Sequence, residues 1–203
     1  VEKIQKNGSI AVVTIKVFDS ELGKHFLVEL AMQQLADDTW QITKINNLKT
    51  LINERDQALQ NKLAELNAPV QKQIDDAVAV APQKIFITSA PYSGVIRLLE
   101  ADIQLTNNAV KELQYFTGVL ELYNADNELF YSGNFASSKD LAAKQAAVYK
   151  FNWELNPFLT DDAKVMNSDF SKVTWKASLS SLSFADGSTI ELLTQLPVKA
   201  ATK

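Results

Sequence analysis

Apolar and polar residues alternate in several stretches of the first 45 residues of the chain. This two-residue period is typical of strands that turn one face toward a core and the other toward water. It predicts three strands, at residues 9–18, 25–35 and 40–45. Because short linkers rich in acidic residues or glycine separate these strands, we expect a three-stranded antiparallel meander.

From Leu48 onward the hydrophobic period becomes that of a helix. Apolar residues recur every three or four positions up to Ala77, and Arg55 is a charged residue within the same stripe. Pro69 interrupts the stripe, which predicts either a kink or the start of a second helix. We expect the helix to cover the apolar face of the meander, and its half after Pro69 to pack on the next domain or on another subunit.

Nearly every segment after residue 82 alternates in the manner of a strand. In the segment at 173–184 the apolar phase switches near Ser180-Ser181, which predicts a β-bulge. Asp186-Gly187 predicts a tight hairpin turn into a last strand. About seven strands with turn residues between them are typical of a β-sandwich.

The composition thins to Ala, Val and Pro at residues 77–82, which we interpret as a domain boundary. The first part is then an α+β unit at residues 1–80, with a three-stranded antiparallel meander and a long C-terminal amphipathic helix. The second part is an all-β sandwich at residues 83–196, and residues 197–203 form a flexible tail.

The segment 103–135 reads as strand, Asn-Asn turn, strand, acidic turn and strand, and it contains Leu120-Glu121-Leu122-Tyr123-Asn124. It resembles the FxLYD-type bacterial domains, with Leu120 in the place of the Phe and Asn124 in the place of the Asp. These domains are immunoglobulin-like sandwiches that are usually found in exported or membrane-anchored proteins. The resemblance implies an immunoglobulin-like second part, a periplasmic or cell-envelope location and no catalytic residues.

The end of the first part, where residues 39–42 lead into the close of the meander at Ile45, looks like part of another family. It is similar to the C-terminal half of cystatin-like or nuclear-transport-factor-like bacterial domains of unknown function. Those folds supply a helix before the sheet. Either the segment that contains this first helix lies upstream of this chain, or the helix from Leu48 takes its place.

Composition and charge exclude several classes of function. The net charge of −4 divides into about −2 on each side of Pro82, which argues against nucleic-acid binding. The absence of cysteine excludes disulfides, zinc–thiolate sites and thiol nucleophiles. No run of roughly 18 apolar residues exists, so we expect no direct membrane insertion within this chain. Because the chain begins with Val1, we expect either a processed protein, from which a signal peptide or membrane anchor has been removed, or an excised piece of a longer chain.

Side chains with candidate chemistry are few. His25 is the one histidine, and no nucleophile motif accompanies it, so we expect no catalytic residue, no cofactor and no enzyme. Oxygen ligands in one loop make a candidate calcium site, with a solvated acidic loop as the alternative and no EF-hand spacing. These ligands are Asp161, Asp162, Asn167 and Asp169.

Two hypotheses of function remain from the sequence. The first is a non-enzymatic extracytoplasmic interaction or spacer protein with an unknown protein partner, which includes self-association through the helix at residues 48–77. The alternative is a small-ligand-binding protein that uses a cavity between the N-terminal sheet and the helix, near Trp40 and Arg55. A pocket of some 300 Å³ or more at those residues would favour the ligand hypothesis.

Overall fold

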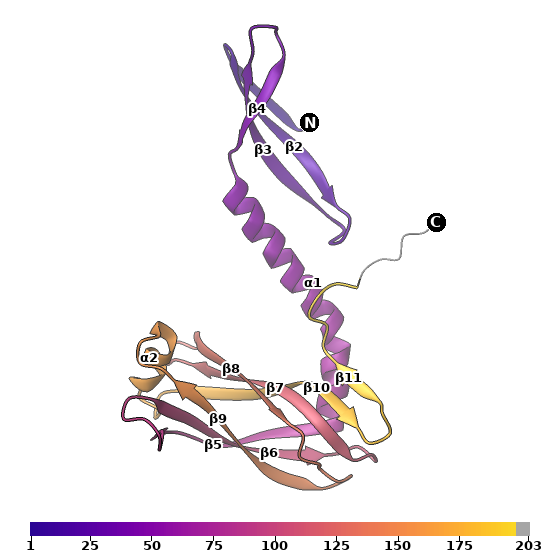
Figure 1. The fold of residues 1–203 in the computed structure, drawn as a ribbon. Helices are drawn as coiled ribbons and strands as arrows, with labels where there is room; N and C mark the ends of the chain where they lie inside the picture. Colours follow the sequence, from indigo (N-terminus) through magenta and orange to yellow (C-terminus); the bar gives the residue numbers. More distant parts are fainter. Residues whose placement is uncertain (198–203) are drawn as a thin grey trace. The chain divides into compact units, whose positions relative to one another are not determined.

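A computed structural model describes residues 1–197, which form two compact units (Figure 1). Among the described residues, unit 1 contains Val1–Asn67 and residues 193–197, and unit 2 contains Ala68–Leu192. The division therefore lies inside a helix and not at residues 77–82. Those residues look like a linker in composition, but Val78 is buried at the start of a strand of unit 2. Of the predicted tail, residues 198–203 lie outside the described residues.

Unit 1 contains an antiparallel sheet in the order β1-β2-β3-β4, which is one strand more than the sequence predicts. The additional strand is β1, in which Ile4 is the one strongly apolar residue, so no alternation identifies it. The signal that could have located it is the turn at Gly8, whose φ of 60° suits a hairpin. The strands are β1 (Lys3–Asn7), β2 (Ile10–Asp19), β3 (Lys24–Gln34) and β4 (Trp40–Ile45).

The helix α1 (Leu48–Ala77) follows β4 and is continuous through Pro69. Just before it, the side-chain amide of Asn47 accepts the N–H of Glu29 at 3.0 Å and donates to the carbonyl oxygen of Leu27 at 2.8 Å. Asn47 thus satisfies backbone groups of β3 in the way that a neighbouring strand would. This connection fixes where the helix leaves the sheet.

Unit 2 consists of two antiparallel sheets, in the orders β11-β10-β7-β8 and β5-β6-β9. For the chain as a whole, the predicted combination of antiparallel sheets with a long helix is confirmed, and the short helix α2 replaces part of a loop in the second part, which the sequence predicts to be all-β. The elements are β5 (Val78–Ser89), β6 (Arg97–Asn107), β7 (Leu113–Tyr123), β8 (Leu129–Ser137), β9 (Ala146–Leu155), α2 (Thr160–Met166), β10 (Thr174–Phe184) and β11 (Thr189–Glu191).

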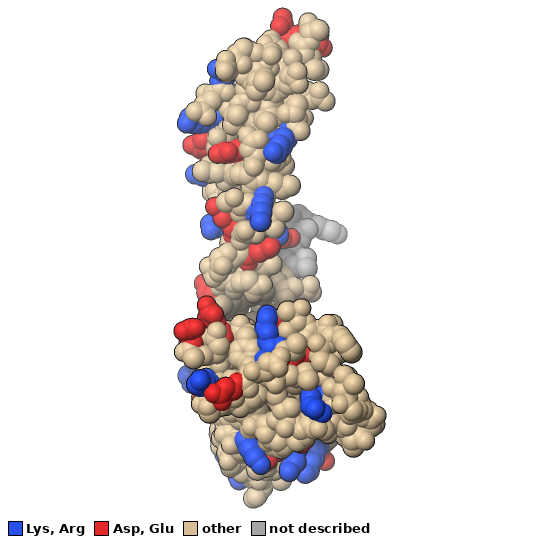
Figure 2. Space-filling view, turned by 90° about the vertical axis from the view of Figure 1, so that its left-hand side faces the viewer, with Lys and Arg blue, Asp and Glu red and all other residues tan. Residues whose placement is uncertain are grey.

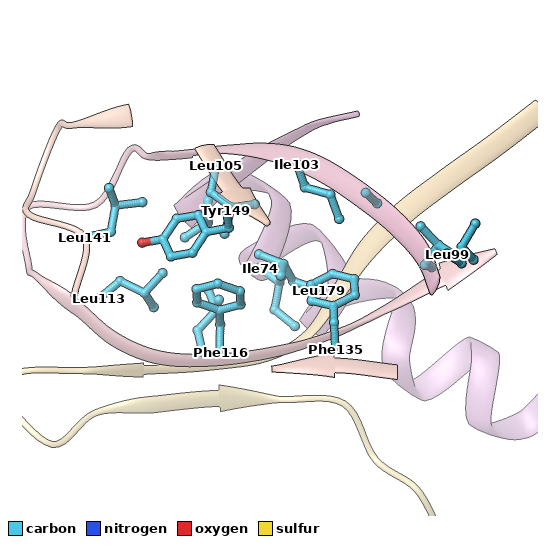
Figure 3. Packing of buried hydrophobic residues seen from close by; sticks show 14 of the residues in the cluster. Ile74, Leu99, Ile103, Leu105, Leu113, Phe116, Phe135, Leu141, Tyr149 and Leu179 are labelled. Atoms are coloured by element: carbon cyan, nitrogen blue, oxygen red, sulfur yellow. The ribbon is translucent and has the colours of Figure 1, made fainter. Parts of the chain in front are cut away.

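The inner faces of the two sheets of unit 2 share one hydrophobic core (Figure 3). Phe116 of β7 meets Tyr149 of β9 edge-on, with 5.0 Å between the ring centroids. Phe135 of β8 also contacts β9 across the sheets: its ring centroid lies 4.6 Å from that of Phe151, with the two rings tilted by 35°. Ile74 of α1 is fully buried in this core, so the half of the helix after Pro69 packs on the sandwich.

A buried asparagine secures one end of the sandwich. Among the described residues, Asn107 is the one polar residue that is fully buried. Its amide nitrogen donates to the carbonyl oxygens of Lys111 at 2.8 Å and Leu141 at 3.0 Å, and its amide oxygen accepts the N–H of Ala109 at 3.0 Å. The side chain therefore ties the β6–β7 loop to the segment before β9.

The predicted bulge in β10 is confirmed, because the pairing with β7 shifts between Leu179 and Ser181. The hairpin at Asp186-Gly187 is longer than a two-residue turn. The N–H of Phe184 donates to the carbonyl oxygen of Ser188 at 2.9 Å, and Gly187 has a φ of 81°. Three residues thus form the loop, and the glycine takes the left-handed position that such loops require.

Candidate functional site

The four residues of the candidate calcium loop do not converge on one point. Asp161 and Asp162 lie in the first turn of α2, Asn167 is its C-cap, and Asp169 follows it. Asp161 forms an ion pair with Lys164 at 2.8 Å, and the carboxylate of Asp162 accepts the backbone N–H of Asn156 at 2.9 Å. Within residues 1–197, no three acidic, histidine or cysteine side chains are placed to hold a metal ion.

Asp169 is also occupied by local hydrogen bonds. Its carboxylate accepts the hydroxyl and the backbone N–H of Ser171 at 2.7 and 3.1 Å, and Lys172 lies 3.3 Å away. These bonds, the Ser171 hydroxyl first, lower the pKa of Asp169. The acidic residues here stabilise the turn around α2, so the solvated-loop interpretation fits their geometry better than a calcium site.

The structure does not bring Trp40 and Arg55 together. Trp40 pairs with Gln34 at the last residue of β3, under the ammonium group of Lys6 at 5.0 Å from its ring. Arg55 contacts Asp19, which lies next to the first residue of β3. Because a strand of this length spans about 33 Å, the two residues lie at opposite ends of the sheet.

A groove of about 530 Å³ does lie beside Arg55, between the β2–β3 turn, α1 and residues 194–197. The guanidinium group of Arg55 contacts Asp19 at 3.0 Å and Glu21 at 3.2 Å. The pKa of Asp19 is lowered, first by the N–H of Leu22 and also by Arg55. The charge of Arg55 is therefore already matched by two carboxylates of the same chain, and little of it remains to attract a ligand.

A different feature distinguishes one end of unit 2, where apolar side chains project into solvent. Phe158 in the β9–α2 loop is 85% exposed, and Leu159, Tyr92 and Val95 are also exposed. The two loops are neighbours because β6 pairs with β5 on one side and with β9 on the other. We call these four residues, Tyr92, Val95, Phe158 and Leu159, the apolar loop end.

Hydrogen bonds hold both loops in place. The hydroxyl of Tyr92 donates to the carboxylate of Glu154 at the end of β9, a bond that raises the pKa of Tyr92. The hydroxyl of Ser93 accepts the N–H groups of Val95 and Ile96 at 3.2 and 3.1 Å. The backbone N–H of Phe158 donates to the side-chain oxygen of Asn156 at 3.0 Å. The backbone is thus ordered while the apolar side chains stay in solvent.

Leu159 occupies the N-cap position of α2, and its side chain makes no capping bond. Ser, Thr, Asp or Asn at this position stabilises a helix by about 1 kcal/mol through a side-chain hydrogen bond. The sequence places an exposed leucine there instead. Positions that break a local stability rule in this way are frequently functional.

Figure 2 shows unit 2 from the end that carries α2 and the β5–β6 loop. In this view the Lys, Arg, Asp and Glu side chains of unit 2 form small separate groups, and most of the surface between them carries no charged side chain. The sequence contained a signal for this surface. The pair Phe158-Leu159 follows Pro157 and belongs to no alternating or helical pattern.

Comparison with family models and with curated proteins gives no match. Among solved structures, the chain is similar to the putative ApaA protein from Bordetella pertussis, with 11% identity, a TM-score of 0.31 and coverage of 57% of this chain and 86% of that chain. A protein from Archaeoglobus fulgidus has 13% identity, a TM-score of 0.31 and coverage of 52% and 86%. A structural-genomics target has 13% identity, a TM-score of 0.36 and coverage of 57% and 80%. These similarities are too low to assign the chain to a family.

Proposed function

We propose that the chain is a non-enzymatic, extracytoplasmic interaction protein. In this proposal, unit 2 is an immunoglobulin-like module that binds a protein partner through the apolar loop end. The observation that carries the proposal is the exposure of Phe158 and its three apolar neighbours on loops that hydrogen bonds keep ordered. Aromatic side chains that enter a partner's pocket commonly dominate the binding energy of an interface.

The strand order of unit 2 supports an immunoglobulin-like module. If β5 to β11 are lettered A, B, C, C′, E, F and G, one sheet holds A, B and E and the other holds G, F, C and C′. Sandwiches of this type gather their loops at the two ends. The apolar loop end consists of the A–B and E–F loops, so it is the end opposite to the B–C and F–G loops through which antibody variable domains bind.

The segment that resembles the FxLYD motif has a structural place in unit 2, which also supports the module. Leu120 and Leu122 are fully buried in β7. The side-chain oxygen of Asn124 accepts the N–H groups of Asp126 and Glu128 at 3.0 and 2.9 Å and closes the β7–β8 turn. The extracytoplasmic location in the proposal rests on this resemblance alone.

The partner would recognise the apolar loop end by burying it. Transfer of one large apolar side chain from water into a pocket contributes about 1.5–3 kcal/mol. Phe158 and Leu159 together would therefore supply a few kcal/mol, the contribution of a small hot spot. A polar replacement of Phe158 is expected to weaken binding without loss of the fold, because the side chain already lies in solvent.

The test is a photo-crosslinking amino acid placed at Phe158 of the full chain in its native host. The matched control carries the same amino acid at Val110, which is 80% exposed in the β6–β7 loop at the other end of the sandwich. We expect one defined protein adduct from position 158 and none from position 110. Absence of an adduct at 158, or the same adducts from both positions, would contradict the proposal.

The location is tested separately by cell fractionation of the native host with periplasmic and cytosolic markers. We expect the protein to follow the periplasmic or envelope marker. Recovery with the cytosolic marker would remove the extracytoplasmic part of the proposal and leave the binding surface untouched. Among residues 1–197, no helix is both long and apolar enough to cross a bilayer.

A further inference from the structure

Unit 1 buries very few of its apolar side chains. Within residues 1–67 and 193–197, only Ala11, Phe26 and Val28 are buried hydrophobic residues. A sheet of this size normally needs a hydrophobic face covered by a helix or another sheet for stability. The apolar residues of unit 1 that remain exposed therefore require an explanation.

The strand register shows which of these side chains share a face. Cross-strand partners point to the same side of a sheet, and Val13 pairs with both Ile4 and Leu30 while Ile42 pairs with Met32. One side of the sheet therefore carries an almost continuous apolar set. We call this side the apolar face: Ile4, Ala11, Val13, Ile15, Val17, Phe26, Val28, Leu30, Met32, Ile42 and Ile45.

The helix α1 lies toward the same side of the sheet but leaves much of it open. Asp19, two positions after Val17 on β2, belongs to the apolar face, and Arg55 reaches it at 3.0 Å. Away from this hairpin end, Ile4 and Ile42 are exposed on the sheet. The facing stripe of α1 is also open, because Leu48 and Ile52 are exposed in its first two turns.

We propose that the open part of the apolar face and the exposed stripe of α1 form an interface with a second copy of this chain. A two-fold axis would place the sheet of each copy on the helix of the other, so that one operation covers both apolar sets. A single partner helix would cover the sheet and leave Leu48 and Ile52 exposed. This inference concerns unit 1 and does not depend on the function proposed for unit 2.

The area available suits a weak and reversible dimer. Each strand residue covers about 3.3 Å by 4.8 Å, so the open half of the sheet offers about 250 Å². The first two turns of the helix, from Leu48 to Arg55, add a surface about 12 Å long and 10 Å wide, or about 120 Å². Two copies would bury about 740 Å², which is the size of a transient interface.

Charge does not oppose this pairing. The cations in the stripe are matched within the chain: Arg55 contacts Asp19 and Glu21, and Lys62 contacts Glu65 at 3.0 Å. The helix of one copy can therefore approach the sheet of the other without bringing an uncompensated charge of Arg55 or Lys62 to it.

The test is sedimentation equilibrium of the full chain across a range of concentrations. We expect the wild-type mass to rise from 22.5 kDa toward twice that value. Ile42→Glu should weaken dimerisation by about 30-fold or more, the loss typical of a hot-spot residue. The matched control is Leu27→Glu, because Ile42 and Leu27 are 53% and 51% exposed and Leu27 lies on the other face of the sheet, as do Phe18 and His25. The control should dimerise like the wild type.

A second measurement avoids any doubt about folding of the glutamate variant. Because the chain has no cysteine, Ile42→Cys and Ile52→Cys can be made in separate, differently tagged copies and mixed under oxidising conditions. A mixed disulfide between the two tags is expected, and Leu27→Cys with Ile52→Cys should not form one. A wild-type monomer at all concentrations, equal effects of both glutamates, or no mixed disulfide would each overturn the proposal.

Discussion

Replacing Gly118 by alanine tests how closely β7 packs against its neighbours in unit 2. An added Cβ would lie 2.3 Å from Cζ of Phe135 and 2.4 Å from the carbonyl oxygen of Ser178. Neither neighbour can move freely, since the Phe135 ring packs against Phe151 and Ser178 belongs to β10, which is paired with β7. We therefore expect the added methyl group to strain the folded state, because no side-chain rotation can make room for it.

The magnitude follows from two opposing effects. Extra volume in a filled core costs about 1–3 kcal/mol, and the upper end applies here because a backbone oxygen is one of the obstacles. Alanine recovers about 0.5–1 kcal/mol relative to glycine inside a strand, since it restricts the unfolded chain. The expected net loss is about 2 kcal/mol, which lowers the Tm of a domain of this size by about 6–10 °C.

The assay is thermal unfolding of the full chain followed by near-UV circular dichroism. The matched control is Gly94→Ala in the β5–β6 loop, where an added Cβ meets no heavy atom within 4 Å. We expect the control to stay within about 2 °C of the wild type. A Gly118→Ala protein that melts with the control would refute the reasoning, because the contact with Ser178 would then be absent.

Two further substitutions test other parts of unit 2. Asn107→Ala should lower the free energy of unfolding by about 2–3 kcal/mol in urea denaturation, because the hydrogen bonds of this fully buried amide to Lys111, Leu141 and Ala109 are lost together; a loss below about 0.5 kcal/mol would mean that water replaces the amide. Burial, and then the charge of Asp140, raises the pKa of Tyr149. Because the pKa of Tyr149 is higher in the folded state, the unfolded chain loses the phenol proton first as the pH rises. The contribution of the neutral phenol to the free energy of unfolding is therefore complete below about pH 10 and is lost as the pH rises further. Between about pH 9 and 11 the Tm of the wild type should therefore fall more steeply than the Tm of Tyr149→Phe, which has no phenol to titrate. Parallel curves of Tm against pH over that range would contradict this.

The alternation of side chains predicts the centre of unit 2 well. β9 and β10 bury one side of a pleated strand, so their apolar residues recur every second position, and the phase switch at Ser180 marks a real bulge. The elements that sequence reasoning misses have no such burial on one face. The strand β1 is exposed at every residue, and α2 is too short for a helical period to be recognised.

The candidate sites were harder to predict, for a physical reason. The hypothesis of a pocket at Trp40 and Arg55 fails because the register of the sheet places the two residues at opposite ends of it. The hypothesis of a calcium site fails because the acidic side chains of the loop are already paired with neighbouring groups. The pair Phe158-Leu159 stands outside every periodic pattern, but its exposure does not follow from that, because an apolar residue in a loop can fold back onto a core or remain in solvent.

The reciprocal contact between Asn67 and Leu193 has a consequence for engineering of the chain. The amide of Asn67 donates to the carbonyl oxygen of Leu193 at 2.9 Å and accepts its N–H at 2.8 Å. These are the last residue before unit 2 and the first after it, so the entry and exit of the sandwich are one hydrogen-bonded pair apart. Unit 2 is thus an insert with adjacent ends, and a short glycine bridge from Asn67 to Leu193 should suffice to excise it or to receive another domain in its place.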